Sequence, residues 1–410
     1  MNKKNNKILI ISAWYFPLFH PRPHRWTAIA EHWAKEGNEV TILTSKQPGF
    51  IENEIRNGVS VHRTGVDSVK TLLAFWKKGR ESRNGAPAGW LWWIYQHIWK
   101  QVVFPDDSCW WYFPARRRLK QLLQKEKFDL IISVSLPFTG HLLGYFAKKQ
   151  QPEAYWIADN GDPFAFQPQA LNNRSLYGAL NRRWEQRVLK MADKSVCTNE
   201  ATRRAYARAY GEAAVQKMQC IPPLLHPAFE QDEVRPPVEG PIIMAYFGAM
   251  YPPMRTPEAL LELVARLNLP IELHFWGEIN PAFQQQLRAY PFVRLRGLHS
   301  RATVREAMRG SHILVNIGNR SSYQLPSKAV EYLAAGRPVL HLSYTEEDPF
   351  AELFKPGNLF FKWLPLEEET AERLEDLKVW INSALFQNIE NQHFNLKKYT
   401  IESIAVGYIV

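Results

Sequence analysis

The stretch LPSKAVEYLAAGRPVL, residues 325–340, decides the fold of this chain. Pro326 suits the first turn of a helix, where its missing N–H costs nothing, and the residues after it are good helix formers. Gly336 can take the left-handed conformation that ends a helix, and Pro338 prevents the helix from continuing. The stretch therefore predicts a loop, a short helix and then a strand.

Two expected strands flank this helix. Residues 312–317 and residues 339–342 are short apolar runs, which indicate buried strands. Strand, loop, helix and strand in this order predict parallel strands joined by a right-handed crossover. The helix would then begin beyond the carboxyl end of a strand, where open α/β sheets bind ligands, and its free N–H groups would attract phosphate.

Lys328 and Glu331 are three residues apart, so they share one face of that helix. A carboxylate would repel a diphosphate, but it can accept hydrogen bonds from sugar hydroxyls, whereas Lys328 suits phosphate. A nucleotide sugar offers both groups. The alternative interpretation is an exposed ion pair on a surface helix, which would stabilise the helix by only about 0.2–0.5 kcal/mol.

Residues 326–339 resemble the donor-binding segment of GT-B glycosyltransferases, in particular glycosyltransferase family 4 of the bacterial cell-surface polysaccharide type. The resemblance rests on Pro-Ser-Lys, two further residues, and then Glu-Tyr-Leu-Ala-Ala-Gly-Arg-Pro-Val. In that family two Glu residues separated by seven others frame the nucleotide sugar. The second matches Glu331, which the resemblance makes a ribose ligand. The first would fall at Tyr323, so the chain departs from the family where the donor sugar is contacted.

Length and composition set the outer bounds. A chain of 410 residues can form two domains, and 46% hydrophobic with 22% charged residues is typical of globular proteins. The net charge of +11 indicates an anionic partner, either a nucleotide or an acidic membrane surface. No block of Lys and Arg carries a nucleic-acid motif, so we expect no nucleic-acid partner.

The cysteines and the apolar runs indicate the cellular compartment in which we expect the protein. Cys109, Cys197 and Cys220 are scattered, and no Cys-x-x-Cys occurs, which favours a reducing compartment without structural zinc. The apolar run at residues 8–11 is too short for a signal-peptide core, and no uncharged run is long enough to span a bilayer. We expect a cytoplasmic protein that sits peripherally on the inner face of the plasma membrane.

The first half of the chain begins with a strand at residues 7–13, a loop, a helix that ends near Gly37, and a strand at residues 39–44. This unit resembles the opening of family 4, although Pro, His and Arg replace the usual glycine-rich loop. His20 and Arg25, with His24 between them, could reach the cleft between the domains, and the resemblance favours Arg25. The alternative is that they are surface loop residues.

Residues 67–120 form an insertion rich in tryptophan and basic residues. It contains Trp76, Trp90, Trp92, Trp93, Trp99, Trp110 and Trp111, with Lys70, Lys77, Lys78, Arg80, Arg83, Lys100, Arg116, Arg117, Arg118 and Lys120. Tryptophan favours the membrane interface and basic residues favour anionic lipid, which suggests a docking surface. The alternative is an amphipathic helical pair that covers the sheet, with some Trp in the core. Both can hold.

Two further strands bring polar residues to their carboxyl ends. After the strand at residues 128–134, Ser135 occupies the place where many family members carry a functional His, and His141 is a weaker substitute. After the strand at residues 154–158, Asp159 and Asp162 resemble an Asp-x-x-Asp-Pro-Trp variant, whose carboxylates contact a substrate hydroxyl. Turn and cap chemistry is the alternative role for both.

The second half alternates strands and helices regularly. Gly248, Ala249 and Gly277 follow expected strands at residues 242–247 and 271–276, where glycine lets backbone approach a diphosphate. Arg255 stands where the family often places a phosphate-binding cation, and a guanidinium binds phosphate in a bidentate manner. The expected donor-binding loop comprises Tyr323, Leu325, Pro326 and Ser327.

The fold predicted from these observations is α/β, of GT-B type, with two Rossmann-like domains whose parallel sheets face each other across a cleft. The expected boundaries are an acceptor domain at residues 1–222, a linker at 223–240, a nucleotide-sugar domain at 241–385, and a segment at 386–410 that packs back on the first domain.

The predicted function is transfer of a sugar, by a hexosyltransferase, from a UDP- or GDP-linked donor to a hydroxyl of a glycan or lipid-linked acceptor. The resemblance implies retention of anomeric configuration, without a cofactor or metal ion. Arg255, Lys328, Glu331 and Asp162 are the predicted catalytic residues. Two alternatives stay open: a catalytically degenerate nucleotide-sugar-binding partner of a glycan-assembly complex, and a sugar-nucleotide epimerase of GT-B architecture.

Overall fold

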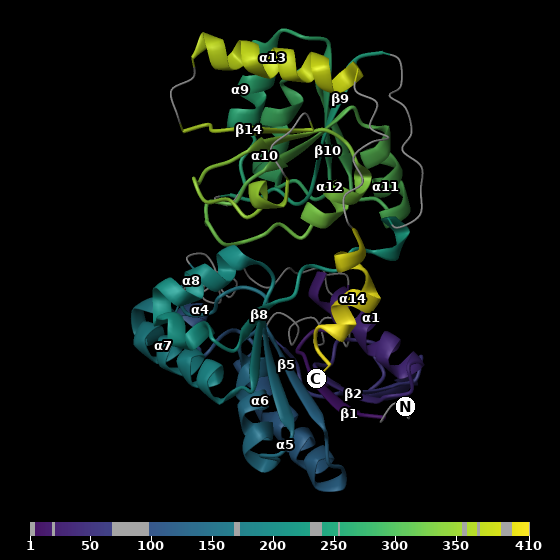
Figure 1. Ribbon diagram of the computed structural model, residues 1–410, viewed down its shortest axis with the longest axis vertical. Helices are drawn as coiled ribbons and strands as arrows, with labels where there is room; N and C mark the ends of the chain where they lie inside the picture. Colours follow the sequence, from purple (N-terminus) through teal and green to yellow (C-terminus); the bar gives the residue numbers. More distant parts are fainter. Residues whose placement is uncertain are drawn as a thin grey trace, which may run out of the picture. The chain divides into compact units, whose positions relative to one another are not determined.

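The computed structural model of the chain describes residues 5–18, 21–67, 98–167, 173–229, 240–252, 255–354, 359–366, 370–386 and 396–409. The chain divides into two compact units, Met1–Pro222 with Ile401–Val410, and Pro223–Thr400. Each unit is an α/β domain built on one sheet (Figure 1). Of the predicted site residues, His20 lies outside the described part of the chain, as do Trp76, Trp90, Trp92, Trp93, Lys70, Lys77, Lys78, Arg80 and Arg83.

The first unit contains an eight-stranded sheet in the order β3-β4-β2-β1-β5-β6-β7-β8, and its pairs are parallel except β3 with β4. The central strands are short apolar runs that are almost wholly buried, as expected for a parallel sheet covered on both faces. The strands are β1 (Lys7–Ile11), β2 (Glu39–Thr44), β3 (Asn53–Arg56), β4 (Val59–Arg63), β5 (Leu130–Ser135), β6 (Tyr155–Asn160), β7 (Lys194–Cys197) and β8 (Met218–Cys220).

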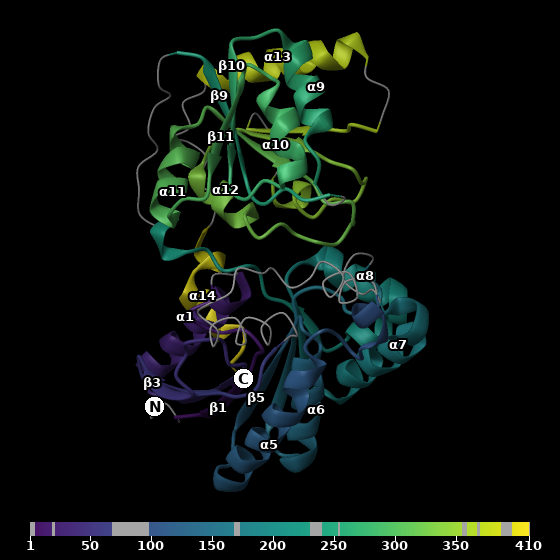
Figure 2. The same cartoon turned by 180° about the vertical axis from the view of Figure 1, so that it is seen from behind.

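Helices cover both faces of this sheet. Strands β2 and β4 are added on one side of β1, and β5 to β8 are added on the other side. Right-handed crossovers therefore place α1 on one face of the sheet and α5, α6 and α7 on the other (Figure 2). The helices are α1 (Pro21–Lys35), α4 (Lys100–Val102), α5 (Cys109–Lys125), α6 (Thr139–Gln150), α7 (Arg174–Met191), α8 (Glu200–Tyr210) and α14 (Ile401–Val406), with the 3-10 turn η2 (Glu212–Val215).

One hairpin in this unit was missed by our sequence prediction. Strand β3 precedes β4 and pairs with it in antiparallel orientation. Asn57 and Gly58 form the connection, with φ of 46° and 82°. Asn-Gly is the preferred pair for a tight hairpin turn, because both positions require positive φ. The dipeptide was therefore a usable signal.

The end of the chain returns to the first unit. Helix α14 lies beside α1, although the two are separated by most of the sequence (Figure 1). Tyr408 packs edge-on against Trp26 and Trp33 of α1, with ring centroids 5.0 and 6.4 Å apart. The preceding turn η6 (Leu396–Tyr399) belongs to the second unit, where the Leu225 N–H donates to the Tyr399 carbonyl oxygen.

The second unit contains a six-stranded parallel sheet in the order β11-β10-β9-β12-β13-β14. Its strands are β9 (Ile242–Phe247), β10 (Ile271–Trp276), β11 (Val293–Gly297), β12 (Ile313–Ile317), β13 (Val339–Leu342) and β14 (Phe360–Trp363). Its helices are α9 (Glu258–Leu267), α10 (Pro281–Arg288), α11 (Arg301–Gly310), α12 (Ala329–Ala335) and α13 (Ala371–Phe386), with the 3-10 turns η3 (Pro227–Phe229) and η4 (Ala351–Leu353).

The order in which strands are added to this parallel sheet changes side between β9 and β12. Strands β10 and β11 extend to one side of β9, whereas β12, β13 and β14 extend to the other. The connections that follow β9 and β12 therefore run to opposite faces of the sheet and leave a crevice at the carboxyl ends of these strands. Such a crevice is the usual ligand position in open α/β sheets. Gly248 follows β9 and Gly318 follows β12, so these two turns border that crevice.

The stretch at residues 325–340 folds largely as predicted. Strand β13 occupies the predicted residues 339–342, and Gly336 ends helix α12 with a φ of 63°. The helix itself is only seven residues long and begins at Ala329, with Lys328 at its N-cap position. So short a helix offers little dipole, and side chains must therefore supply most of the positive charge at this end.

Candidate functional site

The turns after β9 and β10 touch through backbone. A Cβ at Gly277 would lie 2.3 Å from the Gly248 carbonyl oxygen, and Gly277 has a φ of 127°, so no other residue fits there without rearrangement. The Gly248 N–H donates to the Trp276 carbonyl oxygen at 2.9 Å, and the Met250 N–H donates to that of Glu278 at 3.0 Å. The predicted close approach at these two glycines is thus between the two turns, which together form a rigid backbone floor beside the crevice.

Arg255 lies at this floor. Its Nη1 is 3.5 Å from the position that a Cβ of Gly248 would have, and its Nε and Nη2 donate to Oδ1 of Asn319 at 3.3 and 3.1 Å. Asn319 follows β12, and its amide donates to the Gln324 carbonyl oxygen at 3.3 Å. The guanidinium is therefore held across the β9–β12 crevice by a side chain that our sequence prediction did not single out.

Lys328 and Glu331 form the predicted pair at the start of α12. The Lys328 ammonium contacts the Glu331 carboxylate directly. Glu331 is mostly buried, with a side chain 12% exposed, whereas that of Lys328 is 33% exposed. The pair is therefore not the fully exposed surface pair of the alternative interpretation, since the carboxylate is held at the base of the loop with one edge accessible.

Tyr332 connects Arg255 with Glu331. Its hydroxyl accepts from the Phe247 N–H at 3.1 Å and donates to the Val315 carbonyl oxygen at 2.8 Å, which fastens α12 to β9 and β12. Burial raises the pKa of Tyr332 well above its usual value; the charge of Arg255 lowers this pKa and that of Glu331 raises it. The hydroxyl thus fixes the helix that carries Glu331 to the strands that border the crevice.

The loop before α12 contributes further groups. Tyr323, which replaces the first Glu of the family pattern, is buried, and so is Pro326, whereas Ser327 is exposed and Leu325 is half-buried. The loop is braced internally, because the Ser321 hydroxyl donates to Oε1 of Gln324 at 3.0 Å. Among these four predicted donor-binding residues, Ser327 is thus the one whose side chain is open to a ligand.

A buried polar cluster supports the same edge of the sheet and was not predicted. The His341 imidazole lies 2.8 Å from Asp348, and its other nitrogen lies 2.9 Å from the Asn316 amide. Burial alone would raise the pKa of Asp348, but His341 and the Ser343 hydroxyl hold it at about 2. Oδ1 accepts from the Phe350 N–H, so the carboxylate organises the loop after β13.

The first unit gathers its predicted residues at the carboxyl edge of its own sheet. Asp159, at the end of β6, accepts hydrogen bonds from Arg22 Nη1 and Trp26 Nε1, both at 3.0 Å. Arg22 was not singled out from the sequence, yet its guanidinium fills the space beside Gly161 that a Cβ would occupy. Asp159 is buried and paired with a cation, a geometry that serves the fold; its predicted contact with substrate stays a prediction.

Arg25, like Asp159, is buried and hydrogen-bonded within the first unit. Its Nη1 donates to the Pro222 carbonyl oxygen at 2.5 Å, and its Nη2 donates to the Tyr408 hydroxyl at 2.9 Å. The side chain is buried, so its charge is used to join α1 to the end of β8 and to the C-terminal segment. A structural role therefore accounts for Arg25, and its predicted cleft role stays untested.

For His141, burial argues against the predicted role. The side chain is fully buried between Ser133, 2.8 Å from Nδ1, and Asn160, 3.0 Å from Nε2. Burial lowers its pKa to about 3, so the imidazole is neutral near pH 7. His141 thus crosslinks β5 and β6 from the first turn of α6. Sequence position alone could not reveal this, because helix α6 turns the side chain towards the sheet.

Ser135 and Asp162 are the remaining predicted residues of this edge. Ser135 is buried at the end of β5, and its hydroxyl has no hydrogen-bond partner among the described residues. Asp162 is half-buried in the loop after β6. That loop is held by Glu185, a fully buried carboxylate that accepts from the Phe164 N–H at 2.7 Å and the Ala165 N–H at 3.1 Å.

Within the described residues, no group of three or more His, Cys, Asp and Glu side chains is arranged to hold a metal ion. Arg255 contacts Asn319 at the crevice of the second unit, and Lys328 lies at the N-cap position of α12. These two side chains could neutralise a bound diphosphate. The arrangement of backbone floor, guanidinium, ammonium and carboxylate thus suits a ligand with phosphate at one end and hydroxyls at the other.

Comparison with known proteins agrees with this architecture. Residues 25–228 match the family model described as Glycosyltransferase Family 4. Sucrose-phosphate synthase from Thermosynechococcus elongatus superposes with a TM-score of 0.66 at 14% identity, covering 98% of this chain and 97% of that one. HepE of Anabaena, solved with UDP and glucose, gives 0.62 at 12% identity, with 98% of each chain covered.

A third similar structure is WaaG, a glycosyltransferase involved in lipopolysaccharide biosynthesis, with a TM-score of 0.55 at 14% identity, covering 98% of this chain and 99% of that one. No curated protein sequence matches the chain. At such identities the likenesses show the fold, and they confirm the predicted pair of parallel-sheet α/β domains.

Proposed function

We propose that the chain, which has a GT-B fold and matches the family 4 model over residues 25–228, is a glycosyltransferase that transfers a hexose from a UDP- or GDP-linked donor to a hydroxyl of a glycan or lipid-linked acceptor. The observation that carries this proposal is the cluster of Arg255, Asn319 and Gly248 at the β9–β12 crevice, with Lys328 and Glu331 beside it. The UDP and glucose bound by the similar HepE support a uridine donor in particular.

Each group of the cluster has a part in the proposed reaction. Gly248 and Gly277 let the diphosphate approach the backbone, and Arg255 and Lys328 bind its oxygens. Glu331 accepts hydrogen bonds from the ribose hydroxyls. As the glycosidic bond to phosphate breaks, negative charge grows on the leaving diphosphate, and two preorganised cations stabilise that charge. We therefore propose a retaining transfer that needs no metal ion, catalysed by positioning and electrostatics.

Replacing Glu331 by Gln tests the ribose contact. The variant keeps the shape of the side chain but loses a charged acceptor, so the nucleoside diphosphate should bind more weakly by about 1–3 kcal/mol, roughly fivefold to 150-fold. Isothermal titration of UDP and of GDP measures this change. Glu306→Gln, at an exposed position of α11, is the matched control and should bind as the unaltered protein does. Equal affinity of both variants would remove Glu331 from the site.

We also propose that the first unit docks on an anionic membrane, where lipid-linked acceptors are found. Helices α5, α6 and α7 carry a dense positive charge with a single acidic residue, Glu185, which is buried. Their basic residues are Arg116, Arg117, Arg118, Lys120, Lys125, Lys148, Lys149, Arg174, Arg182, Arg183, Arg187 and Lys190. Much of the net charge of +11 is therefore concentrated on one layer of helices (Figure 2).

Exposed apolar side chains gather at one end of this layer. Trp110 is 50% and Phe113 66% exposed, at the start of α5, and Leu176 is 61% exposed at the start of α7. The two helix starts are joined, because the Asn173 amide donates to the carbonyl oxygens of Val103 and Pro105 at 2.7 and 2.9 Å. Aromatic and aliphatic groups next to Lys and Arg are typical of proteins that bind the membrane interface.

A groove of about 510 Å³ opens among these groups. Aromatic side chains dominate its lining: Phe104, Trp110, Tyr112, Phe113, Tyr145, Phe146 and Trp184, with Pro105, Cys109, Leu142 and Lys149. Cations lie over several of the rings, with Arg116 4.7 Å from Phe146 and Arg187 5.0 Å from Trp184. The groove could hold part of a hydrocarbon chain while the basic rim holds its phosphate.

The described part of the tryptophan-rich insertion contains both buried and exposed tryptophan side chains. Trp111 is fully buried and packs in the core with Leu119 of α5, whereas Trp110 is half exposed and stacks on Trp99 with centroids 5.9 Å apart. None of the described helices is long and apolar enough to cross a bilayer. We propose that attachment by this surface is peripheral and that the protein is cytoplasmic.

Reversing the charge of Arg116 and Arg117 tests this docking. Each basic residue near an anionic surface contributes about 1 kcal/mol, so the double change to Glu should weaken vesicle binding roughly thirtyfold or more. Flotation with vesicles containing phosphatidylglycerol, compared with neutral vesicles at low and high salt, measures the effect. Arg118 is spared, because it donates to Asn53 at 3.1 Å and contributes to the fold.

The matched control reverses two exposed arginines elsewhere, Arg208 of α8 and Arg288 of α10, which should leave flotation nearly unchanged. If the protein floats equally with neutral and anionic vesicles, or not at all at low salt, the aromatic groove and its basic rim have no role in membrane attachment. Loss of binding in the control as well would show that only net charge matters.

A further inference from the structure

Two of the three cysteines meet at the carboxyl edge of the first unit's sheet. Cys197 ends β7 and Cys220 ends β8, and the two are directly opposed in the parallel register. Their sulfur atoms are 3.4 Å apart. Neighbouring strands lie about 4.7–4.9 Å apart, which falls inside the Cα separation that a disulfide accepts, about 4.4–6.8 Å. A bond would require the sulfurs to approach by about 1.4 Å, to the usual S–S distance near 2.05 Å.

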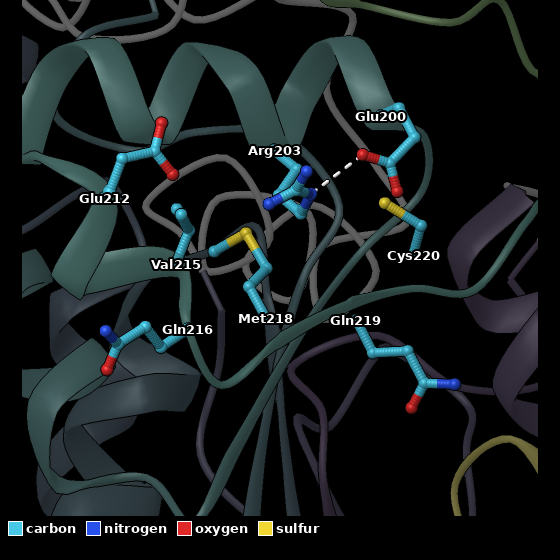
Figure 3. A pocket seen from close by; sticks show the side chains of 8 residues that line it. All are labelled: Glu200, Arg203, Glu212, Val215, Gln216, Met218, Gln219 and Cys220. Atoms are coloured by element: carbon cyan, nitrogen blue, oxygen red, sulfur yellow. Dashed lines mark hydrogen bonds and ion pairs between the residues drawn. The ribbon is translucent and has the colours of Figure 1, made fainter.

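The two thiols differ in access. Cys197 is fully buried, and its thiol donates to the Asn199 carbonyl oxygen at 3.5 Å. Cys220 is half-buried and lines a pocket of about 630 Å³, together with Glu200, Arg203, Glu212, Val215, Gln216, Met218 and Gln219 (Figure 3). A small reagent in this pocket would therefore reach the sulfur of Cys220 before that of Cys197.

The carboxylate of Glu200 lies next to the accessible thiol of Cys220. Figure 3 shows Glu200 projecting towards Cys220, and the hydrogen bond from that thiol lowers the pKa of the Glu200 carboxyl. Arg203 donates to the same carboxylate at 2.7 Å, which keeps it in place. Glu200 is therefore ionised near pH 7, and it accepts a hydrogen bond that keeps the Cys220 thiol at the mouth of the pocket.

We propose that Cys197 and Cys220 are a reversible dithiol–disulfide site that reacts with small hydroperoxides. Cys220 loses its proton to solvent, and its thiolate sulfur attacks the terminal oxygen of the hydroperoxide; the O–O bond breaks, and the alcohol leaves after taking a proton from solvent. The sulfenic acid on Cys220 is then attacked by the sulfur of Cys197. Hydroxide leaves and takes the Cys197 proton as water, so two thiols and one hydroperoxide give a disulfide, an alcohol and water.

The rate of this step depends on pH. The hydrogen bond with Cys197, burial, and the charge of Glu200 together raise the pKa of Cys220 far above its usual value. Since the thiolate is the nucleophile, oxidation should be slow at pH 7 and faster at pH 9. The site would thus respond to strong or sustained oxidant.

The link would act on the strand that leads out of the first unit. Strand β8 has three residues and lies at the edge of the sheet. It is followed directly by Ile221 and Pro222, whose carbonyl oxygens accept from Arg25. A covalent bond to β7 would hold this edge strand in place and close a loop that contains α8, so the oxidised unit should unfold at a higher temperature than the reduced one.

Mass spectrometry of the full chain tests the proposal. Reduced protein treated with hydrogen peroxide at pH 9 should lose two mass units, and non-reducing tryptic digestion should link the peptide that begins at Ser195 to the one that begins at Met218. Cys109, half-buried at the start of α5, is an internal control and should remain open to alkylation. Dithiothreitol should restore the original mass.

Three variants make the outcome decisive. Cys109→Ser should still form the link, whereas Cys197→Ser should stop at the sulfenic or a higher acid on Cys220. Cys220→Ser should leave the buried Cys197 unreacted. A link that involves Cys109, or full alkylation of Cys197 and Cys220 after peroxide treatment at pH 9, would overturn the proposal. Because Cys109→Ser leaves the opposed pair intact, its result does not depend on whether the other variants fold.

Discussion

Arg255→Ala should lower kcat by about a hundredfold to a thousandfold, because the guanidinium acts on charge that develops as the nucleoside diphosphate leaves. The affinity for the free nucleoside should change little, since its base and ribose do not depend on this side chain. The measurement is steady-state release of nucleoside diphosphate from the donor sugar, with titration of the nucleoside as the binding readout. Lys328→Ala should shift kcat in the same direction, again more than nucleoside binding.

The structure supplies controls for this experiment. Arg255→Lys keeps the charge but cannot form a bidentate contact with phosphate or span to Asn319 by two donors, so its kcat should fall between those of the unaltered protein and the Ala variant. Arg288→Ala, at an exposed position of α10, should have normal kcat. An Arg255→Ala variant with unaltered turnover would place the phosphate site elsewhere.

Glu185→Ala should destabilise the first unit by about 3 kcal/mol or more, because it leaves several buried donors unsatisfied at about 1–3 kcal/mol each. The carboxylate accepts from two backbone N–H groups of the loop after β6, and from the hydroxyls of Tyr206, at 2.9 Å, and Tyr210. The loss is measured by urea unfolding, with hydrogen exchange of peptides from the first unit as the readout. Glu153→Ala, at an exposed position, should change stability by less than about 0.5 kcal/mol.

Glu185 also makes the stability of the first unit depend on pH, and its raised pKa fixes the direction of that dependence. Burial raises the pKa of Glu185, and its hydrogen bonds oppose this only in part. The folded protein therefore binds this proton more tightly than the unfolded chain, so the contribution to stability is complete below the usual pKa of Glu and decreases as pH rises through the raised value. Glu185→Gln does not titrate. The stability of the unaltered protein relative to this variant should fall as the pH rises above the usual pKa of Glu; a rise would contradict the raised pKa.

Local patterns were enough to predict the arrangement around residues 325–340. The end of α12 at Gly336, the strand β13 and the meeting of Lys328 with Glu331 all follow from interactions within about four residues. Such contacts are set by the helical repeat and by the backbone conformations that Gly and Pro allow. The alternation of strand and helix likewise predicts a parallel sheet with right-handed crossovers, and hence the edge at which Gly248 and Gly277 lie.

The roles of individual polar residues were decided by tertiary structure alone. Arg25 is tied to Tyr408, at the opposite end of the chain, and His141 is directed into the gap between β5 and β6. Asn319 and Glu185 carry no local signal, yet the first holds the Arg255 guanidinium at the proposed donor site and the second holds the loop of Asp162. A one-dimensional pattern reveals which residues can bind or titrate. Whether each one faces substrate, core or another charge depends on which distant elements pack against it, because burial and pairing arise only when those elements meet.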